Sequence, residues 1–207
     1  MNIKPLILGT SCKFHDPDAV DKNITKAKTE IEIAQRMGFK AIRVFGNLIG
    51  EDEMQCIQRV ACALDQVCEY AKQKNIQVYL EVHGDFNTVD RLNILIEMMQ
   101  NKDNFALIWD IYHTHYVAGY EWKHFYEAMK QWIVHVHIKD AKGKELTLPS
   151  MGELPIIPVL QHMINDGYNG WFSLEWERKW FPELPELEVA LDYLHQHLKQ
   201  NQIKIEK

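Results

Sequence analysis

The sequence predicts one α/β domain in which parallel strands alternate with helices and close into a (β/α) barrel. Short apolar runs rich in β-branched and aromatic residues alternate with longer helical segments throughout the 207 residues. No region contains only strands or only helices, and no low-complexity segment divides the chain, so residues 1–207 are expected to form a single domain. Charged side chains gather near the carboxyl ends of several predicted strands, where α/β barrels place their functional residues.

Each predicted strand is a short apolar run that is followed by a helical segment. Asp16 as N-cap and Pro17 in the first turn predict the start of the first helix, and Gly38 predicts its end. We expect strands at 5–11, 39–46, 76–84, 105–113, 133–140 and 170–176, with a weak seventh at 145–149. We expect helices at 16–38, 51–75, 88–104, 120–132, 155–167 and 185–201.

Charge and composition narrow the range of partners. The net charge is -6 and the isoelectric point is about 5.9, which disfavours nucleic acid as a partner because binding to phosphates requires a basic surface. No apolar run reaches the length of a membrane span, so no membrane partner is expected. The cysteines Cys12, Cys56, Cys62 and Cys68 form no CxxC pair, which is typical of reduced thiols in a cytoplasmic protein.

Four predicted strands bring an acidic or histidine side chain to their carboxyl ends: Glu81, Asp110, His137 and Glu175. The chain has no glycine-rich phosphate-binding turn, so a convergent barrel site is favoured over the crevice of a doubly wound sheet. This oxygen-rich set with one nitrogen suits Mn²⁺, Mg²⁺ or Co²⁺, with Zn²⁺ as a further option. The alternative is that these polar side chains merely pair with one another.

The segment IVHVHIKD, residues 133–140, interrupts an apolar run with two histidines. His135, His137 and Lys139 share one face because side chains alternate along a strand. His137 is the better metal ligand because it lies nearer the carboxyl end. We expect His135 to lie one layer lower in the barrel interior, and Lys139 to lie higher, toward the entering substrate.

Four segments carry a resemblance to a known family: LEVHGDF (80–86), IWDIYHTH (108–115), VHVHIKD (134–140) and MGELPIIPVLQHMINDGYNGWFSLEWE (151–177). Together they resemble the xylose isomerase-like TIM barrels, in particular the sugar phosphate isomerase/epimerase superfamily. The resemblance covers nearly the whole chain. It implies an isomerase or epimerase that acts on a small sugar or related polyol ketone.

The resemblance also implies roles for individual residues. A single divalent ion would be held by Glu81, Asp110, His137 and Glu175. The two glutamates would also form the acid–base pair that moves a proton at the carbon beside a carbonyl. The resemblance and the strand positions make four further residues candidate substrate contacts: His83, His113, Lys139 and, more weakly, Arg43.

The chain departs from this family at its N-terminus. The resemblance places residues 5–11 at the second of the eight family strands, so we expect an incomplete barrel of about seven strands that lacks the first βα unit. An open barrel exposes strand edges, which a second subunit of a homo-oligomer could cover. A truncated gene or a rearranged N-terminal segment would equally account for the missing unit.

Three other functions remain open. A metal-dependent dehydratase (a lyase) of an inosose or a dehydroshikimate-like compound would begin with the same proton removal. A DNA-repair endonuclease of the endonuclease-four type is disfavoured, because residues 145–153 lack the Asp-x-His of its zinc cluster. A catalytically inactive relative is the third, and the missing βα unit is its main support.

Overall fold

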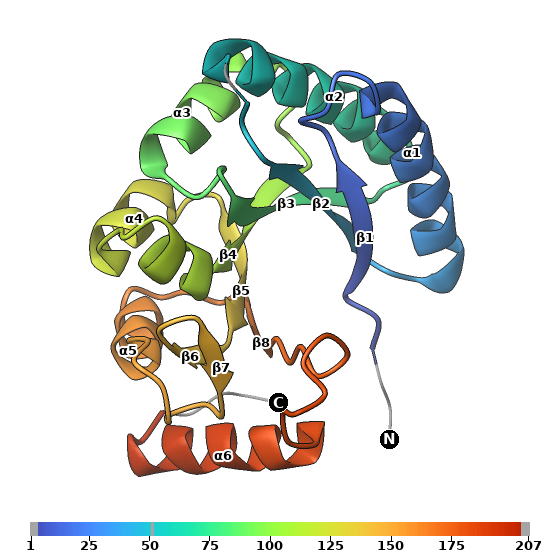
Figure 1. The fold of residues 1–207 in the computed structure, drawn as a ribbon. Coiled ribbons are helices and arrows are strands. Elements are labelled where there is room, and N and C mark those ends of the chain that lie inside the picture. The colour runs from blue at the N-terminus through green and yellow to red at the C-terminus, as the bar shows by residue number, and fades with distance from the viewer. Residues whose placement is uncertain (1–3, 51, 204–207) are drawn as a thin grey trace. The chain divides into compact units, whose positions relative to one another are not determined.

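The computed structural model describes residues 4–50 and 52–203, which divide into two compact units (Figure 1). The first unit comprises Met1–Ile108 and Ala128–Ile133. The second comprises Trp109–Glu127 and Val134–Lys207. The boundary passes within strand β4 (Phe105–Asp110), within helix α4 (Trp122–Met129) and within strand β5 (Ile133–Ile138).

In the first unit, parallel strands lie side by side in the order of the sequence. Strand β1 (Ile7–Lys13) pairs with β2 (Ala41–Asn47), β2 pairs with β3 (Gln77–Gly84), and β3 pairs with the first residues of β4. Helices α1 (Val20–Met37), α2 (Glu53–Gln73) and α3 (Val89–Met98) pack against one another in succession along these strands (Figure 1). This arrangement is the repeated βα unit of a parallel α/β fold.

The core of the first unit follows from the periodicity of its sequence. Helix α2 buries residues at intervals of three and four, including Ile57, Val60, Leu64 and Val67, which places one apolar stripe against the strands. Strand β4 is buried along its whole length, as expected for a strand of a parallel sheet that is covered on both faces.

In the second unit, β5 pairs in parallel with β8 (Trp171–Leu174). Strands β6 (Asp140–Lys142) and β7 (Glu145–Thr147) form an antiparallel hairpin. The helices of this unit are α5 (Ile156–Asn165), α6 (Leu187–Gln200) and most of α4, together with a π-helical turn, η1 (His113–Val117). The Trp109 indole stacks on Phe125 and Tyr126 of α4 and anchors this helix within the unit.

The alternation of strands and helices is confirmed, and several elements differ in detail. The weak strand predicted at 145–149 forms as β7, but it pairs with β6, so six of the described strands pair in parallel. Helix α1 begins at Val20 because Asp16 accepts a hydrogen bond from the Asp18 N–H and forms a turn ahead of the helix. Glu51, the predicted first residue of the second helix, lies outside the described residues.

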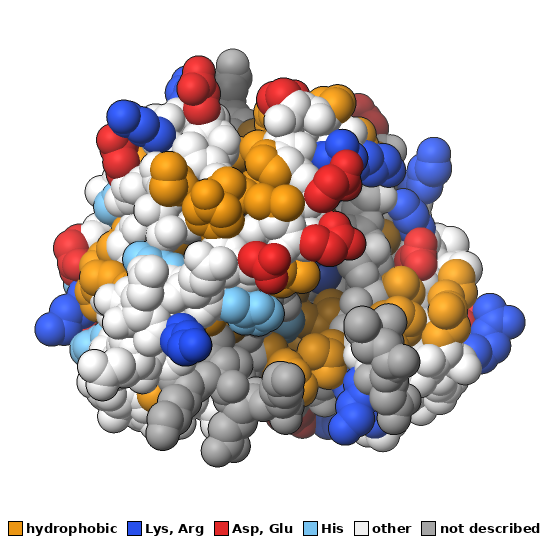
Figure 2. Space-filling view, turned by 90° about the horizontal axis from the view of Figure 1, so that it is seen from below, with side chains coloured by type: hydrophobic (Ala, Val, Ile, Leu, Met, Phe, Trp, Pro, Cys, Tyr) orange, Lys and Arg blue, Asp and Glu red, His pale blue; other side chains and the backbone are white. Residues whose placement is uncertain are grey.

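The surface carries charges of both signs. On the face drawn in Figure 2, acidic and basic side chains are interspersed, with hydrophobic and histidine side chains between them. No helix in the described part of the chain is both long enough and apolar enough to cross a membrane.

A close contact in the first unit gives a direct test of the fold. A Cβ atom at Gly46 on β2 would overlap the ring of Phe86, whereas a Cβ at Gly50 would meet no described atom within 4 Å. We predict that Gly46→Ala lowers the free energy of unfolding by about 1–3 kcal/mol, since overpacking forces the ring out of place. Gly50→Ala is the matched control, and urea denaturation is the measurement. Equal stability of the two variants would contradict the packing described.

Candidate functional site

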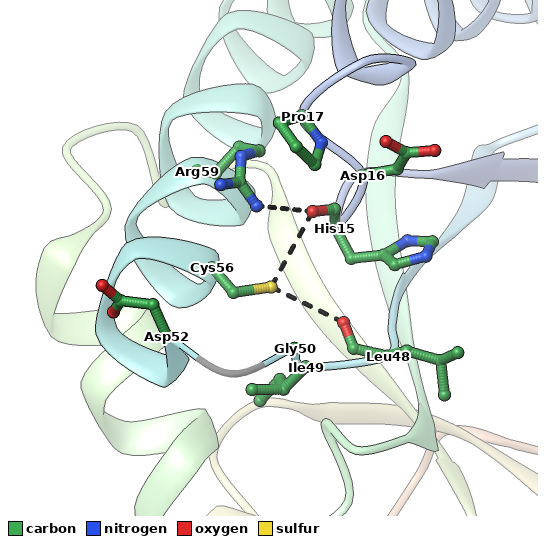
Figure 3. A pocket seen from close by; sticks show the side chains of 9 residues that line it. All are labelled: His15, Asp16, Pro17, Leu48, Ile49, Gly50, Asp52, Cys56 and Arg59. Atoms are coloured by element: carbon green, nitrogen blue, oxygen red, sulfur yellow. Dashed lines mark hydrogen bonds between the residues drawn. The ribbon is translucent and has the colours of Figure 1, made fainter.

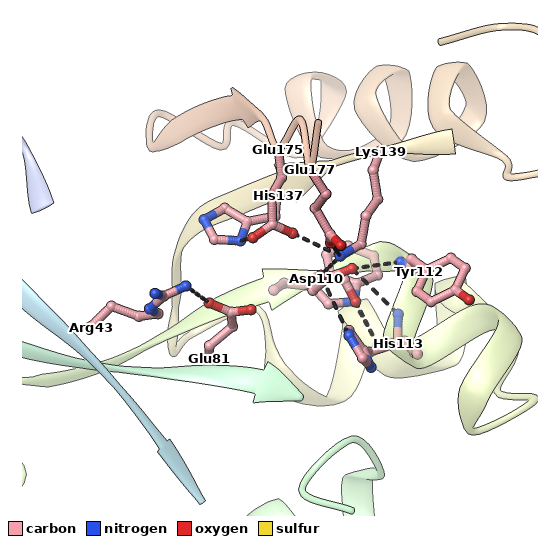
Figure 4. Close-up of polar contacts among 11 residues, drawn as sticks. Arg43, Glu81, Asp110, Tyr112, His113, His137, Lys139, Glu175 and Glu177 are labelled. Carbon is pink, nitrogen blue, oxygen red and sulfur yellow. Dashed lines mark hydrogen bonds and ion pairs between the residues drawn. The ribbon is translucent and has the colours of Figure 1, made fainter. Parts of the chain in front are cut away.

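In the first unit, Glu81 is fixed by Arg43 of the neighbouring strand. The Glu81 side chain is buried, and its Oε2 atom accepts a hydrogen bond from Arg43 Nη1 at 2.7 Å (Figure 4). Arg43 Nη2 donates to the Thr10 carbonyl at 3.1 Å, and the guanidinium lies 4.5 Å from the centre of the Phe45 ring. Arg43 thus orients Glu81 through a fork of donors that a lysine would not provide.

His83 also lies in the first unit, two residues beyond Glu81 on β3. Its imidazole is partly exposed and meets the Phe45 ring edge-on, with centroids 5.3 Å apart. The structure therefore places Glu81 and His83 on the carboxyl-terminal half of β3, with Arg43 on the neighbouring strand β2.

In the second unit, Asp110 ends strand β4 as a fully buried carboxylate. Its Oδ1 atom accepts the backbone N–H groups of Tyr112 at 2.9 Å and His113 at 3.3 Å. Its Oδ2 atom instead faces the ammonium group of Lys139 at 2.8 Å. Burial raises the pKa of the Asp110 carboxyl, and the Lys139 ammonium opposes that rise.

Lys139 contacts three carboxylates of the second unit. Its side chain is only 4% exposed, and its Nζ atom lies 2.7 Å from Glu175, 2.8 Å from Asp110 and 2.9 Å from Glu177 (Figure 4). Burial alone would lower the pKa of Lys139, but the three carboxylates together raise it above its ordinary value. The sequence placed Lys139 higher on the strand than His137, toward the entering substrate, and in the structure its ammonium contacts these three carboxylates.

His137 and Glu175 complete a set of potential metal ligands within the second unit. Asp110, His137 and Glu175 each offer one ligand atom, and these atoms lie within 4.8 Å of one another. His137 Nδ1 is 3.6 Å from Glu175 Oε1. Two carboxylates and an imidazole at this spacing fit a divalent cation, which would also compensate the buried negative charge.

His135 lies deeper than His137, as the sequence predicts. The two rings are 5.4 Å apart at their centroids, and His135 is 4% exposed. His135 Nε2 is 2.6 Å from the Ser173 hydroxyl of β8. Burial lowers the pKa of His135 to about 3, so the ring is neutral and supports β5 and β8 from inside.

His113 lies beside Asp110 at the start of η1. Its Nε2 atom is 4.0 Å from Asp110 Oδ2. The chain leaves strand β4 at Asp110 and turns at once into this π-helical segment, a local form that is frequent at functional sites. The turn explains why β4 is shorter than the predicted strand 105–113.

Two neighbours of the predicted site were not singled out from the sequence. Glu177 lies two residues beyond Glu175 and pairs with Lys139, and the Tyr112 ring centre is 5.3 Å from the Lys139 ammonium. Side chains alternate along an extended segment, so the spacing of two residues puts Glu177 on the face of Glu175. No sequence signal indicated that one lysine would contact both of these carboxylates.

A separate pocket of about 450 Å³ lies in the first unit, beyond the carboxyl ends of β1 and β2 (Figure 3). Arg59 Nη1 donates to the His15 carbonyl at 2.5 Å, and the Cys56 sulfur lies 3.5 Å from the Leu48 carbonyl. Burial raises the pKa of the Cys56 thiol, so it is not an activated nucleophile. The pocket is lined by His15, Asp16, Pro17, Leu48, Ile49, Gly50, Asp52, Cys56 and Arg59.

Parallel strands that alternate with helices, with potential metal ligands at the carboxyl ends of the strands, are features of α/β barrels. Residues 5–197 match the sequence model of the family described as xylose isomerase-like TIM barrel, and the chain belongs to that family. This confirms the predicted TIM-type barrel class, of which the described chain supplies six parallel strands.

Individual relatives give more distant likenesses. The chain is 26% identical over 142 residues to an inosose dehydratase of Serratia proteamaculans (strain 568), which covers 58% of this chain and 48% of the relative. The chain therefore spans about half the length of this curated relative.

Solved structures share the fold at low sequence identity. The IOLI protein with a bound zinc atom has a TM-score of 0.80 at 18% identity, covering 99% of this chain and 78% of that one. The probable 3-DHS dehydratase AsbF of Bacillus anthracis has a TM-score of 0.78 at 16% identity, covering 96% and 77%. An L-ribulose 3-epimerase has a TM-score of 0.75 at 16% identity, covering 96% and 76%.

Asp140, the first residue of β6, organises the segment that follows β7. Its two carboxylate oxygens accept backbone N–H groups from Ala141, Ser150, Gly152 and Leu154 at 2.9–3.1 Å. We predict that Asp140→Ala lowers the free energy of unfolding by about 3 kcal/mol, because it leaves buried N–H groups without an acceptor.

Urea denaturation of Asp140→Ala measures this loss. Asp192→Ala on the exposed face of α6 is the control, and it should change stability by less than about 0.5 kcal/mol. If both variants were as stable as the parent protein, Asp140 would not hold this segment.

Proposed function

We propose that the chain is a divalent-metal-dependent isomerase or epimerase that acts on a small sugar or related polyol ketone. The observation that carries the proposal is the grouping of Asp110, His137 and Glu175 at the carboxyl ends of their strands. Membership of the xylose isomerase-like family and the zinc atom of the IOLI structure support a metal at this set. Mn²⁺, Mg²⁺, Co²⁺ and Zn²⁺ are all compatible with two carboxylates and an imidazole.

We propose Glu81 as the fourth ligand, by its match to the family pattern. When bound, a divalent ion would polarise the substrate carbonyl and stabilise the negative charge that develops on its oxygen. Glu81 and Glu175 are the proposed acid–base pair, one removing the proton beside the carbonyl and the other returning one. Arg43 supports this assignment because it holds the Glu81 carboxylate in one orientation.

The remaining predicted residues are proposed substrate contacts. His83 and His113 carry partly exposed imidazoles at the ends of their strands, suited to hydroxyl oxygens. Arg43 and Lys139 are engaged with carboxylates, so either would meet substrate only by sharing or releasing those partners.

A dehydratase is the second candidate function. The specific support is the match to an inosose dehydratase over 142 residues, together with the fold shared with AsbF. Both reactions begin with removal of a proton beside a carbonyl, and they diverge at the second step. An epimerase returns the proton, whereas a dehydratase expels a hydroxyl group from the neighbouring carbon as water.

The cellular compartment, the oligomeric state and the partners of the protein are also proposals. We propose a cytoplasmic protein, which the four free cysteines and the absence of membrane-length helices among the described residues accommodate. We also propose a homo-oligomer in which a second subunit covers the open edge expected from the sequence. Neither nucleic acid nor a membrane is a proposed partner.

A metal-loaded screen in deuterated water tests the proposal. Ketoses, inososes and dehydroshikimate-type acids are incubated with the Mn²⁺-loaded protein and followed by NMR and mass spectrometry. We expect one class to exchange hydrogen for deuterium beside its carbonyl. An isomerised product that differs in mass from its substrate only by incorporated deuterium identifies an isomerase or epimerase, and loss of water identifies the dehydratase.

Charge-neutral variants test the roles of the glutamates. We predict that Glu81→Gln and Glu175→Gln each lower turnover by at least about 10²-fold, because each removes one proton-transferring group. Glu188→Gln, exposed on α6, is the matched control and should keep full activity. Undiminished turnover in both active-site variants would refute the two-glutamate mechanism, and failure of the wild-type protein to bind any divalent ion would refute the metal.

A further inference from the structure

We propose that the Lys139 ammonium is the resident cation of the metal-free site, and that a divalent ion binds by displacing it from Asp110 and Glu175 while Glu177 retains it. The inference rests on the proposed function, because it takes Asp110 and Glu175 to be metal ligands. It gives a role to Glu177 and gives Lys139 a role in addition to the proposed substrate contact.

The two cations compete for the same oxygen atoms. Asp110 Oδ1 already accepts two backbone N–H groups, so Oδ2 is the atom that faces a cation. Lys139 Nζ lies 2.8 Å from this Oδ2 and 2.7 Å from Glu175 Oε2. A divalent ion at these oxygens would lie within a few ångströms of the ammonium, where repulsion between the two positive charges is strong. Metal binding therefore exchanges one cation for another.

Glu177 can remain paired with the Lys139 ammonium after a metal ion displaces it. It lies 2.9 Å from Lys139 Nζ, yet it is not among the residues whose ligand atoms gather into the metal-binding set. Its side chain is 28% exposed, whereas Asp110 is fully buried, so the path from Asp110 to Glu177 leads toward solvent. The flexible four-carbon stem of lysine allows this short movement, and the ammonium keeps a partner throughout.

The arrangement explains how the carboxylates tolerate the absence of metal. Asp110, Glu175 and Glu177 would repel one another strongly around an empty centre, and Lys139 compensates part of that charge. The cost is weaker metal binding. If the ammonium occupies the cation position in about nine of ten metal-free molecules, the apparent Kd for metal is raised about tenfold.

Titration calorimetry with Mn²⁺ tests the inference on the full chain. Lys139→Gln removes the competitor, so we expect the Kd for Mn²⁺ to fall about tenfold. Glu177→Gln removes the retaining carboxylate, so the ammonium stays on Asp110 and Glu175 and the Kd should rise severalfold. In the double variant, the Glu177 substitution should have no further effect, because there is no ammonium left to retain.

Lys142→Gln, an exposed lysine on β6, is the matched control and should leave the Kd unchanged. An unaltered or raised Kd in Lys139→Gln would overturn the inference while leaving the proposed function intact. If Lys139→Gln does not fold, Glu177→Gln decides alone, and an unchanged Kd in that variant is contrary to the inference. If the wild-type protein does not bind Mn²⁺, both the proposed function and the inference fail.

Discussion

Compensation of buried negative charge determines how the side chains around Asp110 are arranged in the second unit. Asp110 lies at the end of an entirely buried strand and would be costly as an isolated carboxylate. Two backbone N–H groups, one ammonium and two further carboxylates surround it, so the position of each group follows from the charge of the others. The negative charges around Asp110 favour a cation next to it, and that cation can be the Lys139 ammonium or a metal ion.

The parallel βα repeat brings these groups together. The carboxyl ends of parallel strands lie at one edge of a sheet. The potential ligands lie at this edge: Asp110 ends β4, His137 is near the end of β5 and Glu175 follows β8. Short side chains are therefore sufficient to bring their ligand atoms together. Beneath them, His135 and Ser173 form a neutral layer that joins β5 to β8. Beyond them, Asp140 fixes the segment that follows β7 by accepting the backbone N–H groups of Ser150 and Gly152.

The sequence predicted the repeated strands, most helix positions and the candidate donors, because hydrophobic periodicity and strand-end position are local properties. It did not predict that residues 145–147 pair with 140–142, since a three-residue strand carries no signal for its partner. It placed Lys139 on the face of His135 and His137 but did not predict its three carboxylate partners. A lysine side chain reaches several partners, and its choice depends on carboxylates brought close by distant segments, such as Glu177. The roles of Glu81 and Glu175 stay predictions.

We propose that Asp110, His137 and Glu175 bind a divalent cation. Crystals soaked in Mn²⁺ and measured at a wavelength where manganese scatters anomalously test this most directly. We expect one strong anomalous peak within bonding distance of all three side chains, with the Lys139 ammonium moved toward Glu177. An absent peak, or a peak bound only by other residues while Lys139 still bridges Asp110 and Glu175, would contradict this claim.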